Sequence, residues 1–199
     1  MENELGALDV SRKTGKENFT TQDKTLEHNL LGFWQWAYSD IASNTLRGVL
    51  AEYIVACALG IATPTRIEWD AYDLQTSEGV KVEVKSAAYL QSWSQLKLSA
   101  ISFDIAPTKS WDASTNQSSD ETKRQADVYV FCLLHHKDKQ TLNPLRLAQW
   151  TFYLLPTSIL NANMPEQKRI SLSVLLRLNP IETNFSEISE TIQTILLQQ

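Results

Sequence analysis

A β-hairpin is predicted at residues 73–85, where a turn signal separates two short stretches that favour strands. Valine alternates with a charged residue from Val80 to Lys85, and this period of two is typical of a strand with one buried face. The residues before it, Ser77-Glu78-Gly79, suit a type I turn followed by a left-handed glycine. Such a loop pairs Thr76 with Val80, so we expect a fixed antiparallel register.

The predicted register places two carboxylates opposite each other, because it pairs Asp73 with Glu83. Directly opposed residues hold their Cβ atoms roughly 4.5–5.5 Å apart. Two facing carboxylates repel each other unless a cation lies between them, and magnesium prefers oxygen ligands and retains several waters. Lys85 lies two residues further along the same face, where it can act on one of those waters. The alternative is a solvated strand face with a cross-strand salt bridge.

A third acidic residue lies in a predicted helix that is otherwise almost entirely apolar. The segment 44–60 carries two charges, Arg47 and Glu52, and ends at a glycine. A helix that is apolar nearly all round is usually buried, and a buried carboxylate requires a partner because an isolated charge is costly to desolvate. The partner of Glu52 is then either an arginine, Arg47 or Arg66, or a cation bound at the predicted hairpin.

The remaining pattern predicts one sheet flanked by helices. Val128–Leu134 is a continuous apolar run, as in a central strand buried on both faces, whereas residues 107–125 are polar and suit a long surface loop or a short polar helix. The order of elements is typical of an α/β or α+β fold with a central mixed β-sheet. We expect a polar N-terminal arm at 1–28 and a single domain at 29–199. Further elements are expected as a helix at 30–38, strands at 66–69, 99–105 and 150–155, and helices after Pro156, the last starting near Asn184.

Composition narrows the function classes. The net charge of −5 argues against a generally basic protein that coats nucleic acid. The two cysteines, Cys57 and Cys132, fall in apolar runs without metal-ligand spacing, so we expect reduced core residues in a cytoplasmic protein. The N-terminus has no apolar signal region, and the longest apolar run, Val128–Leu134, is too short to span a membrane. We therefore expect no membrane partner.

The acidic residues and the lysine together resemble the PD-(D/E)XK nuclease superfamily, which has the restriction-endonuclease-like fold. Glu52 looks like the helix acid of that family, Asp73 like its strand acid, and Glu83-Val84-Lys85 like its E-x-K triplet. The resemblance covers about residues 44–134. It departs from the family pattern at Tyr72, which stands where a proline often precedes the strand acid.

This resemblance implies a metal-dependent endonuclease that hydrolyses phosphodiester bonds, with DNA as the expected partner in restriction, repair or mobile-element biology. It implies that Asp73, Glu83 and the backbone carbonyl of Val84 hold Mg²⁺, for which Mn²⁺ can substitute. Lys85 would then orient the attacking water or stabilise the charge that develops on the phosphate, with Glu52 as a further acidic group. Candidate substrate contacts are Ser86, Gln91, Trp93, Lys123 and Arg124.

Each of these interpretations has a competing one. Gln91 and Trp93 also suit a packed aromatic residue beside a surface glutamine, and Ser86 the end of a strand. Lys123 and Arg124 have acidic neighbours in sequence, which favours a solvated loop over a phosphate contact. A non-catalytic module that binds nucleic acid or protein on the same fold is the alternative function, and an unrelated α+β protein is the third. A homodimer would explain double-strand cleavage, although no heptad pattern predicts one.

Overall fold

A computed structural model describes residues 8–62, 65–66, 71–112 and 116–197. In chain order its elements are β1 (Asn18–Thr21), β2 (Lys24–Asn29), α1 (Leu30–Tyr38), α2 (Asn44–Ala58), β3 (Leu74–Gln75), β4 (Lys81–Ala88), β5 (Ser102–Asp104), β6 (Thr108–Asp112), β7 (Gln117–Lys123), β8 (Val128–Leu134), β9 (Trp150–Pro156), α3 (Thr157–Asn163), β10 (Arg169–Ser171), α4 (Leu172–Arg177), β11 (Ile181–Thr183) and α5 (Ile188–Leu197), with 3₁₀ turns at Leu147–Gln149 and Phe185–Glu187.

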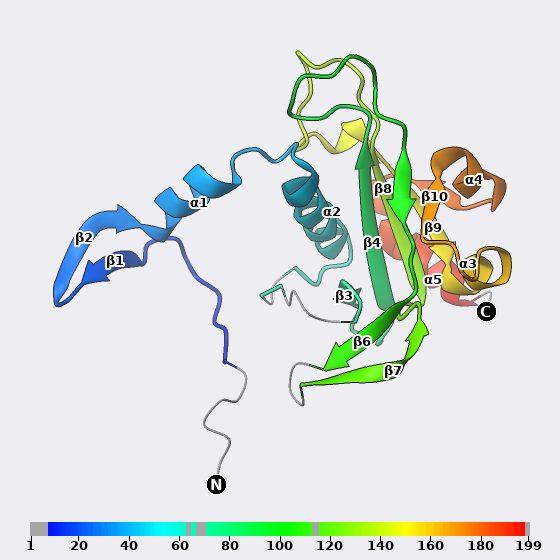
Figure 1. The fold of residues 1–199 in the computed structure, drawn as a ribbon, viewed down its shortest axis with the longest axis horizontal. Coiled ribbons are helices and arrows are strands. Elements are labelled where there is room, and N and C mark those ends of the chain that lie inside the picture. The colour runs from blue at the N-terminus through cyan, green and yellow to red at the C-terminus, as the bar shows by residue number, and fades with distance from the viewer. Residues whose placement is uncertain (1–7, 63–64, 67–70, 113–115, 198–199) are drawn as a thin grey trace, which may run out of the picture.

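The centre of the molecule is a five-stranded mixed sheet in the order β11-β9-β8-β4-β3 (Figure 1). β4 and β8 are parallel, with Val82 beside Val128, and the other neighbouring pairs are antiparallel. All seven residues of β8 are buried, as expected for a central strand covered on both faces. The predicted class, a mixed β-sheet flanked by helices, is confirmed.

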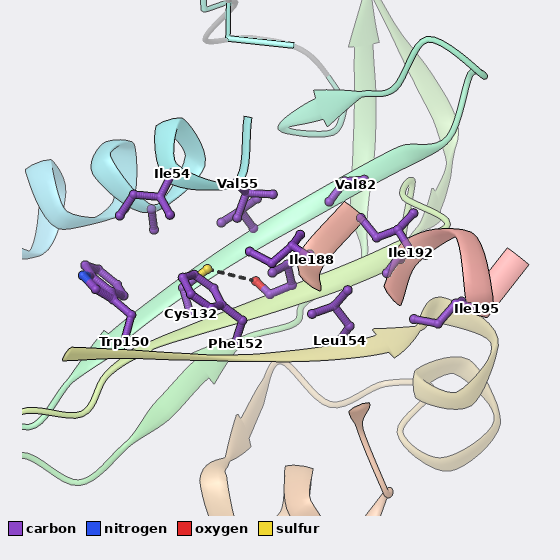
Figure 2. Packing of buried hydrophobic residues seen from close by; sticks show 14 of the residues in the cluster. Ile54, Val55, Val82, Cys132, Trp150, Phe152, Leu154, Ile188, Ile192 and Ile195 are labelled. Atoms are coloured by element: carbon purple, nitrogen blue, oxygen red, sulfur yellow. Dashed lines mark hydrogen bonds between the residues drawn. The ribbon is translucent and has the colours of Figure 1, made fainter. Parts of the chain in front are cut away.

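The two faces of the sheet bury separate apolar clusters. Helices α2 and α5 cover the face that carries the even-numbered residues of β4 and β8, and Figure 2 shows Ile54 of α2 and Ile188 of α5 on the same side of the sheet as Cys132. The other face carries the odd-numbered residues and packs against β5, β10, α3 and α4 through Phe103, Leu160 and neighbouring side chains. Glu83 and Lys85 are odd-numbered and therefore belong to this second face.

Helix α2 confirms the predicted helix and ends at Ala58. Gly60, two residues further on, has a φ of +70°, the left-handed conformation that glycine adopts readily. Its burial differs from the expectation of a helix enclosed on all sides. Ala51 and Val55 pack on the sheet, while Tyr53 and Cys57 on the other side are exposed. The prediction that Cys57 is a core residue is therefore wrong, because a helix packed on one sheet face buries only one side; Cys132 is buried as predicted.

The N-terminal part forms a separate arm. The β1–β2 hairpin and α1 extend away from the sheet (Figure 1), and α1 has no buried residue. Aromatic and aliphatic side chains, including Phe33 and Trp36, line a groove of about 560 Å³ between the hairpin and the helix. The predicted helix at 30–38 is confirmed.

Two predicted elements differ from the structure. In the polar segment 107–125, expected as a loop or a helix, the described residues form two antiparallel strands, β6 and β7, with Trp111 beside Ser118. Of the strand predicted at 99–105, only Ser102–Asp104 is paired, with β10. The strand predicted at 66–69 falls largely outside the described residues. None of the described helices is long and apolar enough to cross a bilayer.

Candidate active site

The hairpin at residues 73–85 has the predicted register. The N–H of Thr76 donates to the carbonyl of Val80 at 2.9 Å, and Gly79 closes the turn with a φ of +89°. Leu74 lies beside Val82, so the next position in the same register brings Asp73 opposite Glu83. The sequence pattern therefore does place the two carboxylates together.

Asp73 lies at the edge of the sheet, just before β3 begins. Its Oδ2 accepts a hydrogen bond from the backbone N–H of Val84 at 2.7 Å. The side chain thus occupies the place of a strand neighbour at this point of β4. The N–H and C=O of one strand residue project to the same side, so the Val84 carbonyl also faces this edge, beside the Asp73 carboxylate.

Glu83 and Lys85 form an ion pair on the adjacent face of β4. The Nζ of Lys85 lies 2.5 Å from Oε1 of Glu83, and both side chains are half-buried. The predicted alternative, a salt bridge on a strand face, is thus present, but it is within the strand and the face is only partly solvated. One ammonium group therefore lies beside two carboxylates.

The site carries an excess of negative charge that shows in its pKa values. Burial, followed by the charge of Glu83, raises the pKa of the Asp73 carboxyl to about 7, against the opposing effect of Lys85. For Lys85, burial disfavours the charged form, but Glu83 and Asp73 together outweigh burial and raise the pKa of the ammonium group. Lys85 is therefore charged at neutral pH, and an additional cation would be favourable beside Asp73.

We expect Asp73→Asn to stabilise the metal-free protein at alkaline pH. The unfolded chain releases the Asp73 proton near its ordinary pKa of 3.8, whereas the folded protein retains it to about 7. Folding therefore becomes less favourable as the pH rises from about 4 to 7, and this penalty is fully present above 7. Asparagine keeps an acceptor for the Val84 N–H and removes the charge, so the free energy of unfolding at pH 8 should rise by about 1–3 kcal/mol.

Thermal unfolding in EDTA at pH 4 and pH 8 measures this effect. The variant should gain stability over the wild type at pH 8 and match it near pH 4, and Mg²⁺ should then stabilise only the wild type. Asp127→Asn is the matched control, since its Oδ2 also accepts a strand N–H, that of Lys81, at 2.8 Å. A less stable Asp73→Asn protein at pH 8 would contradict the expectation.

The donor set at this edge fits a hard divalent cation. Asp73 Oδ2 and Glu83 Oε1 are engaged as described above, while Oδ1 and Oε2 make no hydrogen bond to any residue that the structure describes. Two carboxylates and the Val84 carbonyl suit Mg²⁺ or Mn²⁺, which commonly take one or two carboxylates and complete their coordination with waters. Across the described ranges, no group of three or more acidic, histidine or cysteine side chains could hold a metal ion.

Glu52 is not part of this group. Its carboxylate pairs with Arg66, through Nε and through Nη2 at 3.1 Å. Of the two arginine partners considered from the sequence, Arg66 is therefore the one observed. Glu52 projects from α2, which covers the other face of the sheet, and acts on Asp73 only as the last of several influences that raise its pKa.

Ser86 and Gln91 contact a buried arginine instead of the Glu83–Lys85 pair. Arg47 of α2 is 4% exposed, and it donates to Ser86 Oγ at 3.1 Å, Gln91 Oε1 at 3.3 Å and Asn44 Oδ1 at 2.7 Å. Gln91 is itself buried, which is the opposite of the surface glutamine considered from the sequence. This network joins α2 to the strand that carries the candidate catalytic residues.

The other candidate substrate contacts lie in different environments. Trp93 is 52% exposed, and Lys123 is exposed and pairs with Glu121 at 2.6 Å. Arg124, by contrast, is buried and donates to the Ile105 carbonyl and to Asn161 Oδ1, each at 2.8 Å. The expectation of a solvated loop is therefore wrong for Arg124, whose guanidinium anchors the end of β7 to distant parts of the chain.

Two residues near the site were not predicted from the sequence. Tyr129 of β8 is the register partner of Glu83, and Asp104 of β5 contributes to raising the pKa of Lys85. The available signals were weak: Tyr129 carries the one hydroxyl group in an otherwise apolar strand, and Asp104 lies near the end of an alternating segment. Their placement depends on strand pairings that span many residues.

A mixed sheet that presents two carboxylates and a lysine at one edge is compatible with an α+β nuclease-like fold. Residues 2–173 match the family model described as Bacteriophage T4 endonuclease IV. The match spans well over half of the chain, and the chain belongs to this family, which places it among the nucleases. No curated protein matches the chain.

Proposed function

We propose that this protein is a metal-dependent endonuclease of the PD-(D/E)XK class that hydrolyses phosphodiester bonds in DNA. The observation that carries the proposal is the convergence of Asp73, Glu83 and Lys85 at one edge of the sheet. The family match supports an endonuclease and suggests DNA as its substrate.

In this proposal Asp73, Glu83 and the Val84 carbonyl hold Mg²⁺, with Mn²⁺ as a substitute. The bound ion would supply Lewis acidity towards a phosphate oxygen and lower the pKa of a bound water. Asp73 is held in place for this role by the Val84 N–H, and the charge of Glu83 beside it makes capture of a cation favourable.

Lys85 acts as a positive charge and hydrogen-bond donor. Its raised pKa keeps the ammonium protonated at neutral pH, which favours orientation of the attacking water and stabilisation of phosphate charge over proton abstraction. Glu83 fixes the position of the ammonium through their ion pair. Glu52 adds to the negative potential at Asp73 from α2.

Among the candidate substrate contacts, exposure favours Trp93 and Lys123, which a phosphate backbone or a base can reach. Ser86 and Gln91 support the site through Arg47 instead. In this proposal their effect on cleavage follows from the position of β4 and not from contact with nucleic acid.

A panel of supercoiled plasmid, single-stranded DNA, branched DNA and RNA, incubated with Mg²⁺ or Mn²⁺, tests the proposal. We expect cleavage of at least one DNA substrate, its loss in EDTA, and its recovery when Mg²⁺ is restored. A folded protein that cuts no DNA with either ion would overturn the proposed activity. DNA binding without cutting would instead favour a non-catalytic module on the same fold.

A further inference from the structure

Tyr129 lies directly beside the candidate active site. It is the partner of Glu83 in the parallel β4–β8 register, and paired residues of neighbouring strands project their side chains from the same face of a sheet. Phe131, the next residue of β8 on this face, and its β9 partner Tyr153 belong to the same apolar cluster as Tyr129. The Tyr129 ring therefore extends from the sheet on the side of Glu83 and Lys85.

The hydroxyl of Tyr129 has no hydrogen-bond partner among the residues that the structure describes. The residue as a whole is only 3% exposed. Its oxygen nevertheless has some solvent exposure, because within the described ranges the only fully buried side-chain oxygen or nitrogen without a hydrogen-bond partner is Thr157 Oγ1. A buried tyrosine usually directs its hydroxyl to a hydrogen-bond partner. Here the hydroxyl group at the end of the Tyr129 side chain reaches the surface beside Glu83 without donating a hydrogen bond.

Packing alone does not account for a tyrosine at this position. The ring stacks on Phe131 with centroids 5.7 Å apart, and a phenylalanine would fill the same space. Every other residue of β8 is apolar. The hydroxyl is thus the one side-chain oxygen of this central strand, and Tyr129 lies beside Glu83.

The surroundings keep this hydroxyl neutral. Burial, followed by the charge of Glu83, raises the pKa of Tyr129 well above its ordinary value, with Asp104 and Asp73 acting in the same direction and Arg124 opposing them. A phenol that retains its proton is a hydrogen-bond donor and adds no further negative charge to a site that binds an anion. The neutral hydroxyl can therefore donate a hydrogen bond to an anionic oxygen of a bound substrate.

We propose that Tyr129 is a further catalytic residue, whose hydroxyl donates a hydrogen bond to a non-bridging oxygen of the scissile phosphodiester. The proposal rests on the proposed nuclease function. Lys85 and Tyr129 both adjoin Glu83, one along the strand and one across it, so the two donors can reach the same phosphate group. The hydroxyl keeps its proton throughout and stabilises the charge that develops as the phosphate is attacked.

Tyr129→Phe tests this role, because it removes one oxygen and keeps the ring. We expect the single-turnover rate of DNA cleavage to fall by about 10- to 100-fold, in the range of a hydrogen bond to a charged group. DNA affinity, measured in a Lys85→Ala background that does not cut, should change by less than about twofold, since the bond strengthens in the transition state. The melting temperature should be unchanged.

The matched control is Tyr153→Phe, the same substitution on the same sheet face. Tyr153 is 7% exposed. Burial, followed by the charges of Glu182 and Tyr89, raises the pKa of its hydroxyl, and none of the candidate site residues contributes. This variant should cut at the wild-type rate. If Tyr129→Phe also cuts at the wild-type rate while Lys85→Ala does not cut, the role of Tyr129 is overturned and the proposed function stands.

Two other outcomes are equally informative. A wild-type protein that cuts no substrate overturns the proposed function together with the role of Tyr129. A lower melting temperature for Tyr129→Phe, with a fall in rate no larger than that of an equally destabilised variant elsewhere in β8, assigns the residue to packing and overturns the catalytic role.

Discussion

Lys85→Ala is expected to abolish DNA cleavage, lowering the rate at least about a thousandfold. The variant removes the one ammonium group that pairs with Glu83 and offsets the charge of Asp73. Loss of a single donor that stabilises a transition state typically costs a hundredfold to a thousandfold, and this donor also carries a full charge. A plasmid-nicking assay with Mg²⁺, followed over several decades of time, measures the change.

The fold of this variant should persist, because the ion pair is only half-buried and its loss should cost about 1–2 kcal/mol. Lys81→Ala is the matched control: it lies on the same face of β4, and its Nζ stacks over the ring of Tyr72, 5.3 Å from the centroid. The control should cut normally. Cleavage by a folded Lys85→Ala protein at more than a tenth of the wild-type rate would exclude the proposed mechanism.

Arg47→Ala is expected to give the largest loss of stability, about 3–5 kcal/mol in the free energy of unfolding. The guanidinium is buried, and burial lowers its pKa. Its four acceptors among the described residues are all neutral oxygens, including the Ala42 carbonyl at 3.1 Å. Removing it leaves these acceptors without their donor and opens a cavity between α2 and β4. Urea unfolding, with comparison of the midpoints, measures the loss.

The matched control for this prediction is Arg169→Ala in β10, where the side chain is exposed and the expected change is below about 0.5 kcal/mol. Arg47→Lys should recover only part of the loss, since one ammonium cannot reproduce the planar fork of donors. A decrease below 1 kcal/mol for Arg47→Ala would show that water replaces the guanidinium in this network.

The hairpin was predictable from the sequence because its determinants are local. A three-residue loop and alternating valines fix the pairing of Asp73 with Glu83 without reference to the rest of the chain. The buried strand Val128–Leu134 was equally predictable from its unbroken apolar run. These two elements define the sheet on which the candidate site is built.

The pairing of β4 with β8 could not be predicted from the sequence, since it joins Val82 to Val128, which are far apart in the chain. The position of Tyr129 beside Glu83 follows from that pairing, and so could not be anticipated. Because α2 is apolar on nearly all sides, its sequence does not indicate which side faces the sheet. The prediction that Cys57 is buried was wrong for this reason. Polar strands such as β6 and β7 bury no apolar face and gave no alternation to detect.

The bond between the Val84 N–H and the Asp73 carboxylate makes one backbone amide a spectroscopic reporter of the site. Most amides of a sheet are protected from exchange with solvent deuterium by a bond to a neighbouring strand, whereas the protection of Val84 depends on a titratable side chain. Protonation of Asp73, or a cation drawing on the same carboxylate, weakens the acceptor. The Val84 resonance should therefore shift, and its hydrogen should exchange faster, in step with the occupancy of the candidate site.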